Sequence, residues 1–268
     1  MKFKTRTAPE RIRLLQNPPT RRVLLYFPKM QICGTMQGMM TKTQFDTFLK
    51  GVDLKRYRKM YSAVKILEMD MPKDTQAINL LYRVYWEERE PLSFENFYQR
   101  YRAERTQELK TFRKKTTMCE DCFERGLKAR IYRTWAGLIT QIHAGYVAES
   151  VFGKDSVAMS RELDSMGADI RVTYKEQHLN YQVKKTSYSG VMSRHPLPRK
   201  KRLPGKNIDL KYEVPTCLSD PKTKSGEYRK PYLRFVSDKR TTAFDNGFVT
   251  FTTATFQPDK DTIDRKSH

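Results

Sequence analysis

The sequence is poor in cysteine and in long apolar runs. Four cysteines among 268 residues are too few for a disulfide-stabilised scaffold, so a reducing cytoplasm is the expected environment. No run approaches the ~18 consecutive apolar residues of a membrane-spanning helix, and no apolar segment follows the charged start, so we expect neither a membrane span nor a secretory signal. Because a phosphate-cradling glycine-rich loop, His-Glu-x-x-His and Gly-x-Ser-x-Gly are all missing, NTP hydrolysis, zinc peptidase and esterase chemistry lack support.

Acidic residues are also scarce relative to basic ones. There are 30 Asp and Glu against 52 Lys and Arg, which gives a formal charge of +22 and a pI near 9.8. Such a balance predicts a polyanionic partner, either nucleic acid or an anionic membrane surface. Only 38% of residues are apolar, but aromatic residues make up 12%, and these provide enough large side chains to build a folded core.

The basic charge is concentrated in two segments. Residues 1–30 hold eight Lys and Arg against one Glu, and residues 183–240 hold sixteen against five, half of the total excess. The charge therefore predicts a basic N-terminal arm over 1–40 and a basic loop at 186–240 that binds nucleic acid, and these flank a helical region over 41–118 and the start of a C-terminal part over 119–268. Backbone-tracking contacts are expected from the loop residues Arg194, Arg199, Lys200, Lys201 and Arg202.

Hydrophobic spacing changes from helical to strand-like along the chain. It predicts a helical hairpin over 45–61, a helix that begins after Ser93 and continues one apolar face to Phe112, and a long helix over 121–148. Alternation then predicts a hairpin of strands 169–174 and 179–184, and a further β-rich run follows the Asn246-Gly247 turn. The order predicts a mixed α+β fold with a central mixed sheet flanked by helices.

The predicted hairpin brings together a set of polar side chains suited to phosphodiester cleavage. Asp169 lies on the polar face of the first strand, and Gln182 and Lys184 lie on the polar face of the second. A carboxylate can hold Mg²⁺, and a lysine can orient or deprotonate the attacking water. Considered alone, a solvated hairpin in a basic protein explains these residues equally well.

Five stretches of the sequence match a known family in the same order, and they support the interpretation of the hairpin residues as a nuclease site. Asp-(x)n-Gln-x-Lys resembles the PD-(D/E)xK nuclease signature with glutamine in its middle position. The chain also resembles the TaqI family of type II restriction endonucleases in FLKGVDL (48–54), SFENF (93–97), GLKARIYRT (126–134), ELDSMGAD (162–169) with QVKK (182–185) and, more weakly, NGFV (246–249). The resemblance implies that residues 119–268 form a restriction-endonuclease-like PD-(D/E)xK nuclease core, with the basic loop at 186–240 binding DNA.

The resemblance also implies roles for individual residues. Asp169 would be the main metal-binding carboxylate, Gln182 would occupy the second acid's position and Lys184 the catalytic lysine position. Asp164 and Lys185 match positions that the family treats as functional. Because glutamine is uncharged, the metal would depend on Asp169, the Val183 carbonyl and water. Glu149, at the end of the long helix, could add a carboxylate from across the site.

Other candidate residues have simpler explanations. Cys119 and Cys122 have the spacing of a zinc pair but no second close pair, so buried thiols are the preferred interpretation. His143 is expected to be packed in the core, and His178 to be a solvated turn residue. Arg130 and Arg133 lie on the polar face of the long helix. We interpret them as phosphate contacts, although a solvated helix face is a close alternative.

The resemblance implies a Mg²⁺-dependent endonuclease that cuts double-stranded DNA at a short palindromic site, with TCGA as the first guess. Two-fold DNA symmetry favours a homodimer, and a cognate DNA methyltransferase that protects the site of a bacterial or archaeal host is implied. Two alternatives remain: a structure-selective nuclease such as a junction resolvase, and a non-catalytic basic nucleic-acid-binding protein.

Overall fold

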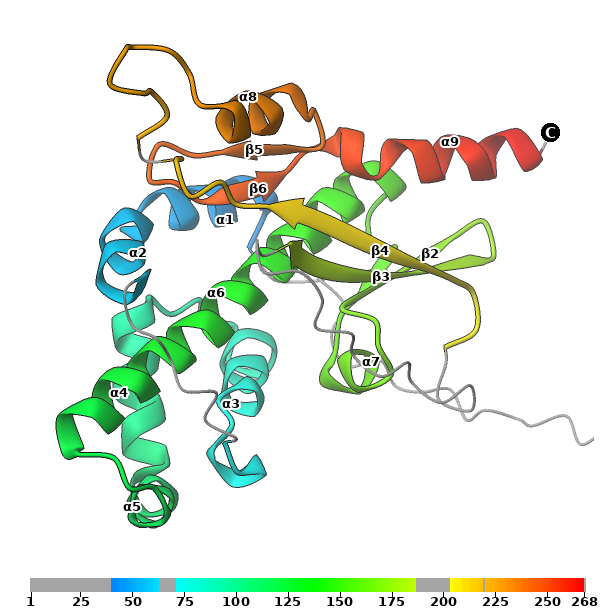
Figure 1. The fold of residues 1–268 in the computed structure, drawn as a ribbon. Coiled ribbons are helices and arrows are strands. Elements are labelled where there is room, and N and C mark those ends of the chain that lie inside the picture. The colour runs from blue at the N-terminus through cyan, green and yellow to red at the C-terminus, as the bar shows by residue number, and fades with distance from the viewer. Residues whose placement is uncertain (1–39, 63–70, 187–202, 219, 268) are drawn as a thin grey trace, which may run out of the picture. The chain divides into compact units, whose positions relative to one another are not determined.

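The computed structural model describes residues 40–62, 71–186, 203–218 and 220–267, in which helices flank a four-stranded sheet (Figure 1). The sheet has the order β1-β2-β3-β4; β1, β2 and β3 are antiparallel neighbours, whereas β4 runs parallel to β3. This confirms the predicted mixed sheet flanked by helices. The strands are β1 (Val157–Ala158), β2 (Ile170–Tyr174), β3 (Gln177–Thr186) and β4 (Lys206–Glu213).

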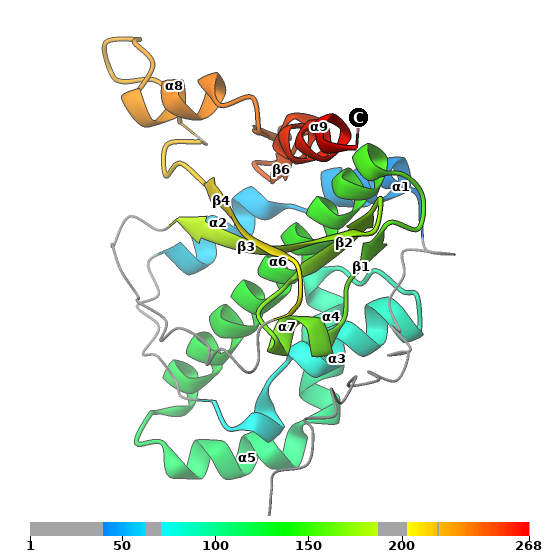
Figure 2. The ribbon, with the colours of Figure 1, turned by 90° about the vertical axis from the view of Figure 1, so that its right-hand side faces the viewer.

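The long helix α6 (Glu120–Phe152) connects the helical region to the sheet (Figures 1 and 2). It confirms the helix predicted over 121–148 and extends it at the C-terminal end. The helix ends at Gly153, whose φ of 107° is a conformation that glycine adopts at little cost. Near this end the Phe152 ring packs edge-on against Tyr174 of β2. Closer to the middle of α6, Trp135 is almost fully buried against Phe94.

The helical region consists of α1 (Lys42–Lys50), α2 (Leu54–Ser62), α3 (Ile78–Tyr82), α4 (Phe94–Glu104) and α5 (Thr106–Lys115), with a 3-10 helix at Lys73–Thr75. The predicted helical hairpin and the start of α4 are confirmed, because the Ser93 hydroxyl accepts the Asn96 N–H. The predicted single face that continues to Phe112 is interrupted, however. The chain leaves helical geometry at Arg105, and the new direction of α5 lets Phe112 contact Phe123 of α6.

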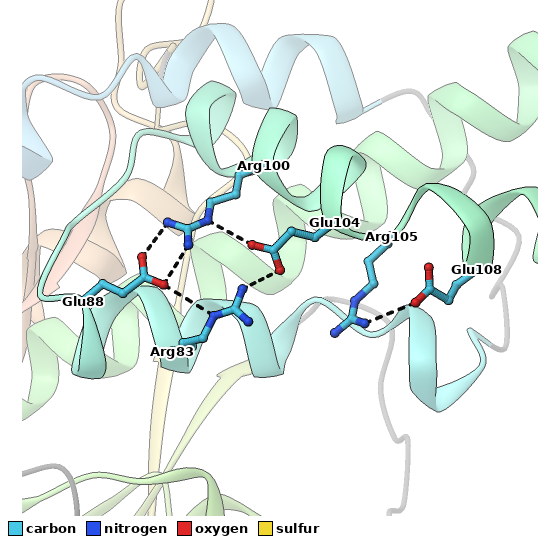
Figure 3. Close-up of polar contacts among 6 residues, drawn as sticks. All are labelled: Arg83, Glu88, Arg100, Glu104, Arg105 and Glu108. Atoms are coloured by element: carbon cyan, nitrogen blue, oxygen red, sulfur yellow. Dashed lines mark hydrogen bonds and ion pairs between the residues drawn. The ribbon is translucent and has the colours of Figure 1, made fainter.

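A closed set of ion pairs joins α4 to a π-helical turn, Arg83–Glu87, that follows α3 (Figure 3). Glu88 receives two hydrogen bonds from the Arg100 guanidinium, at 2.6 and 2.7 Å, and Glu104 pairs with both Arg83 and Arg100. Bidentate Arg–carboxylate pairs are the strongest of this type. The network therefore fixes the turn, which is a less stable geometry than an α-helix.

The C-terminal part contains α8 (Lys230–Ser237), the two-stranded sheet of β5 (Thr241–Ala243) and β6 (Val249–Phe251), a 3-10 helix at Thr253–Thr255, and α9 (Gln257–Lys266). The predicted turn at Asn246-Gly247 is confirmed, with a φ of 83° at the glycine. The Asn246 amide also donates to the carbonyls of Leu49 and Val52, so this turn ties β5 and β6 to the end of α1.

The structure confirms the simple interpretation of His143 and contradicts that of Cys119 and Cys122. His143 is indeed packed: its side chain is buried, Nε2 lies 3.2 Å from Asp46 and Nδ1 accepts the Phe251 N–H. The interpretation of Cys119 and Cys122 as buried thiols is wrong, because both are exposed. Cys119 instead caps α6, since its sulfur accepts the Cys122 N–H at 3.2 Å. None of the described helices is long and apolar enough to cross a membrane.

Candidate active site

The β2–β3 hairpin positions the candidate site. Its two-residue turn, Lys175 and Glu176, has positive φ at both positions, the geometry that matches the twist of the flanking strands. The resulting register places Ile170 opposite Tyr181, and both side chains are buried in the core. Because side chains alternate along a strand, Gln182 must face the other side of the sheet.

Asp169 lies directly before β2 and contacts the β3 backbone on both sides of Gln182. Its N–H donates to the Tyr181 carbonyl at 2.9 Å, and its Oδ2 accepts the Val183 N–H at 2.7 Å. The side chain is only 4% exposed, so these backbone contacts hold a nearly buried carboxylate in one place. The hairpin therefore brings Asp169 and the Gln182–Val183 segment together.

Lys184 lies two residues beyond Gln182 on the same face, and its ammonium contacts β4. Lys184 Nζ is 2.7 Å from Asp209 Oδ1, and the parallel register places Asp209 beside Gln182. Sequence reasoning missed Asp209. The alternating apolar residues Ile208, Leu210 and Tyr212 were a sufficient signal for a strand, but nothing local indicated which strand it would pair with.

Three other expected site residues lie on β3, α7 and α6. Lys185 is exposed and, by alternation, is directed away from Gln182. Asp164 is exposed on the short helix α7 (Arg161–Ser165), which ends shortly before Asp169. Glu149 lies in the last turn of α6, where its Oε1 accepts the Asp155 N–H at 3.1 Å. The structure therefore gives Glu149 a role at the helix end.

Tyr82, at the end of α3, is a residue near the site that the sequence did not indicate. Its hydroxyl is buried and makes no hydrogen bond to any residue that the structure describes. Burial raises the pKa of Tyr82, and the negative charges of Asp164, Asp169 and Glu162 raise it further. The helical region thus contributes an aromatic side chain close to the acidic part of the site.

The predicted DNA-contacting residues fall into two groups. Arg130 and Arg133 are both exposed on α6, and Tyr132 between them packs against Tyr57 and Phe94 of the helical region. The loop residues Arg194, Arg199, Lys200, Lys201 and Arg202 lie outside the described residues. Parts of the segment predicted as a basic loop form β4 and α8.

An open cleft of about 540 Å³ lies apart from the polar face of the hairpin. It is lined by the end of α1, the start of α2 and the start of α4, and its charged side chains are Asp53, Arg56 and Glu95. The stretches 48–54 and 93–97 meet here. Their placement gives the helical region a concave surface of mixed polar and apolar side chains, and Asp169 is not among the residues that line it.

The donor set suits a small hard cation. The described residues include no cluster of three His, Cys, Asp or Glu side chains that could hold a metal ion. The Asp169 carboxylate, the Gln182 carboxamide and the Val183 carbonyl nevertheless provide oxygen ligands within two adjacent strand segments. Mg²⁺ prefers oxygen ligands, keeps several waters and needs only one or two carboxylates. These residues therefore fit Mg²⁺.

Comparisons with known proteins identify the family of this chain. The family model for the TaqI restriction endonuclease matches residues 42–257. The type II restriction enzyme TaqI of Thermus aquaticus is 32% identical over 195 residues, covering 70% of this chain and 72% of that enzyme. The type II restriction enzyme TthHB8I of Thermus thermophilus is 31% identical over 150 residues, covering 54% of this chain and 57% of that enzyme. No solved structure matches the chain. The chain therefore belongs to the TaqI restriction endonuclease family, and its activity is that of a site-specific endonuclease.

Proposed function

We propose that this chain is a Mg²⁺-dependent type II restriction endonuclease that hydrolyses double-stranded DNA at a short palindromic site, with a TCGA-like sequence as the first candidate. The observation that supports this proposal most directly is the arrangement of Asp169, Gln182 and Lys184 on adjacent segments of one hairpin. The net charge of +22 supports a DNA substrate, because basic side chains that neutralise phosphates release counterions.

Each residue of the hairpin has a distinct role in this proposal. Asp169, the Gln182 carboxamide and the Val183 carbonyl would hold Mg²⁺, which neutralises charge on the phosphate when it is bound. Lys184 would orient the attacking water and help to remove its proton. Glu149 remains a weaker metal candidate because its carboxylate already accepts the Asp155 N–H. Asp164 and Lys185 would act from the border of the site.

The DNA would extend beyond the hairpin across the basic surfaces. Arg130 and Arg133 are exposed and would contact phosphates, as would Arg194 and the segment 199–202. A palindromic target would be cut by a homodimer, because two-fold DNA symmetry matches two-fold protein symmetry. Such an enzyme requires a cognate DNA methyltransferase to protect the host site, and its substrate places it in the cytoplasm of a bacterium or archaeon.

A plasmid digest tests this proposal. With Mg²⁺, the protein should convert plasmid DNA into discrete fragments whose ends share one palindromic sequence, and EDTA should stop the reaction. Cleavage confined to branched DNA would favour a junction resolvase instead. A gel shift without cleavage in any divalent metal would indicate a non-catalytic DNA-binding protein and would contradict the proposal.

A further inference from the structure

The candidate metal site lacks one negative charge, because Gln182 stands where the nuclease signature has a second carboxylate. Gln182 is neutral, and two lysines lie on the same face of the sheet. They are Lys184 of β3 and Lys211 of β4, which pair with each other in the parallel register. A single carboxylate, Asp169, must then attract a divalent cation against nearby positive charge. Opposite charges stabilise an ion and like charges destabilise it, so a second acid close to Gln182 would have a large effect on metal affinity.

Asp209 is the acid that the fold places there. The parallel register puts Asp209 of β4 directly beside Gln182 of β3, and side chains at matched positions of neighbouring strands share a face. Its contact with Lys184 confirms that shared face, because Lys184 lies two residues from Gln182. Asp169 contacts the other side of the same β3 segment, at Tyr181 and Val183. The two carboxylates therefore flank Gln182 from β2 and β4.

We propose that Asp209 is the second metal-binding carboxylate of this site and that it supplies from β4 the charge that Gln182 does not supply from β3. This inference rests on the proposed function, because it concerns the metal of that site. In the structure the Lys184 ammonium occupies the position next to Asp209 Oδ1, at 2.7 Å. A divalent cation held by Asp209 would compete with that ammonium for the carboxylate, and Lys184 released from the pair would be available to the phosphate and the attacking water.

The exposure of the pair permits this exchange. The side chains of Lys184 and Asp209 are 39% and 48% exposed, so solvent and ions reach both. An exposed ion pair of this kind is a weak interaction. Lys184 therefore competes with a divalent cation but does not exclude it.

Manganese binding to the full-length protein without DNA, measured by titration calorimetry, tests the inference independently of cleavage. Asp209→Asn preserves the shape of the side chain and removes its charge, and it should weaken Mn²⁺ binding by about 10-fold or more. Lys184→Ala should bind Mn²⁺ at least as tightly as the wild type, because it removes the competing ammonium. Gln182→Glu in the Asp209→Asn background should restore affinity, since it returns a carboxylate to the same level of the sheet.

A matched control comes from the other end of the hairpin. Asp264 of α9 pairs with Lys175 at 2.6 Å, with a similar exposure, so Asp264→Asn breaks an equivalent Asp–Lys pair far from Gln182. This variant should bind Mn²⁺ like the wild type. The inference is overturned if Asp209→Asn also binds like the wild type, if Lys184→Ala weakens binding as much as Asp209→Asn does, or if Gln182→Glu restores nothing. Absence of DNA cleavage by the wild type would contradict the proposed function but would leave these affinities unaffected.

Discussion

Replacing Asp169 by asparagine or by alanine should separate the chemistry of the site from its folding. Asp169 Oδ2 accepts the Val183 N–H at 2.7 Å, and the side chain is 4% exposed. Asparagine retains a carbonyl oxygen for that N–H, whereas alanine leaves a buried donor unpaired. An unpaired buried donor costs about 1–3 kcal/mol, and 1 kcal/mol lowers the melting temperature of a chain of this size by about 2–4 °C.

The expected results are therefore different in the two assays. Differential scanning calorimetry should show Asp169→Asn within about 2 °C of the wild type and Asp169→Ala lower by several degrees. Single-turnover cleavage in Mg²⁺ should fall more than about 100-fold in both, the scale of removing one contact that stabilises a transition state. Wild-type cleavage by Asp169→Asn would refute the metal assignment, and wild-type stability of Asp169→Ala would refute the structural role of the carboxylate.

Three further predictions concern other parts of the chain. Lys184→Ala should abolish single-turnover cleavage, whereas Lys185→Ala should reduce the cleavage rate less, because alternation directs only Lys184 toward Gln182. The reverse ranking would mean that the strand register is wrong by one residue. Changing residues 199–202 to alanine should reduce the salt slope of DNA binding by about 0.9 for each lost phosphate contact, on cognate and scrambled duplexes alike, and an unchanged slope would show a solvated segment. Burial lowers the pKa of His143 below its usual 6.5, despite the nearby Asp46. A lowered folded-state pKa means that unfolding takes up protons, so the free energy of unfolding should fall as pH drops below about 6.5, and His143→Gln should reduce this dependence in urea titrations.

The elements with regular patterns could be predicted from the sequence. The spacing of Leu127, Ile131 and Trp135 fixes α6 as a helix, and alternation around Val172 and Tyr181 fixes the hairpin, because one face of each element must be buried. The break at Arg105 could not be predicted, since both α4 and α5 are helical and only the contact between Phe112 and Phe123 decides their directions.

The grouping of the candidate site residues in space could be predicted where they are local in sequence. Asp169, Gln182 and Lys184 belong to one hairpin, so period-two alternation was enough to group them. Asp209 and Tyr82 come from segments that join the site only through long-range packing. The pairing of β4 with β3 follows a long connection whose length does not determine the strand order, and α3 approaches the site from a separate helical region.

The central claim is that this chain cuts DNA at a specific sequence with the centre at Asp169, Gln182 and Lys184. The most direct measurement is a plasmid digest in Mg²⁺ with the wild type, Asp169→Asn and Lys184→Ala in parallel, followed by sequencing of the fragment ends. The account predicts discrete fragments with one shared palindromic end sequence from the wild type and intact plasmid, still bound in a gel shift, from both variants. The same fragments from either variant at the wild-type rate would contradict it.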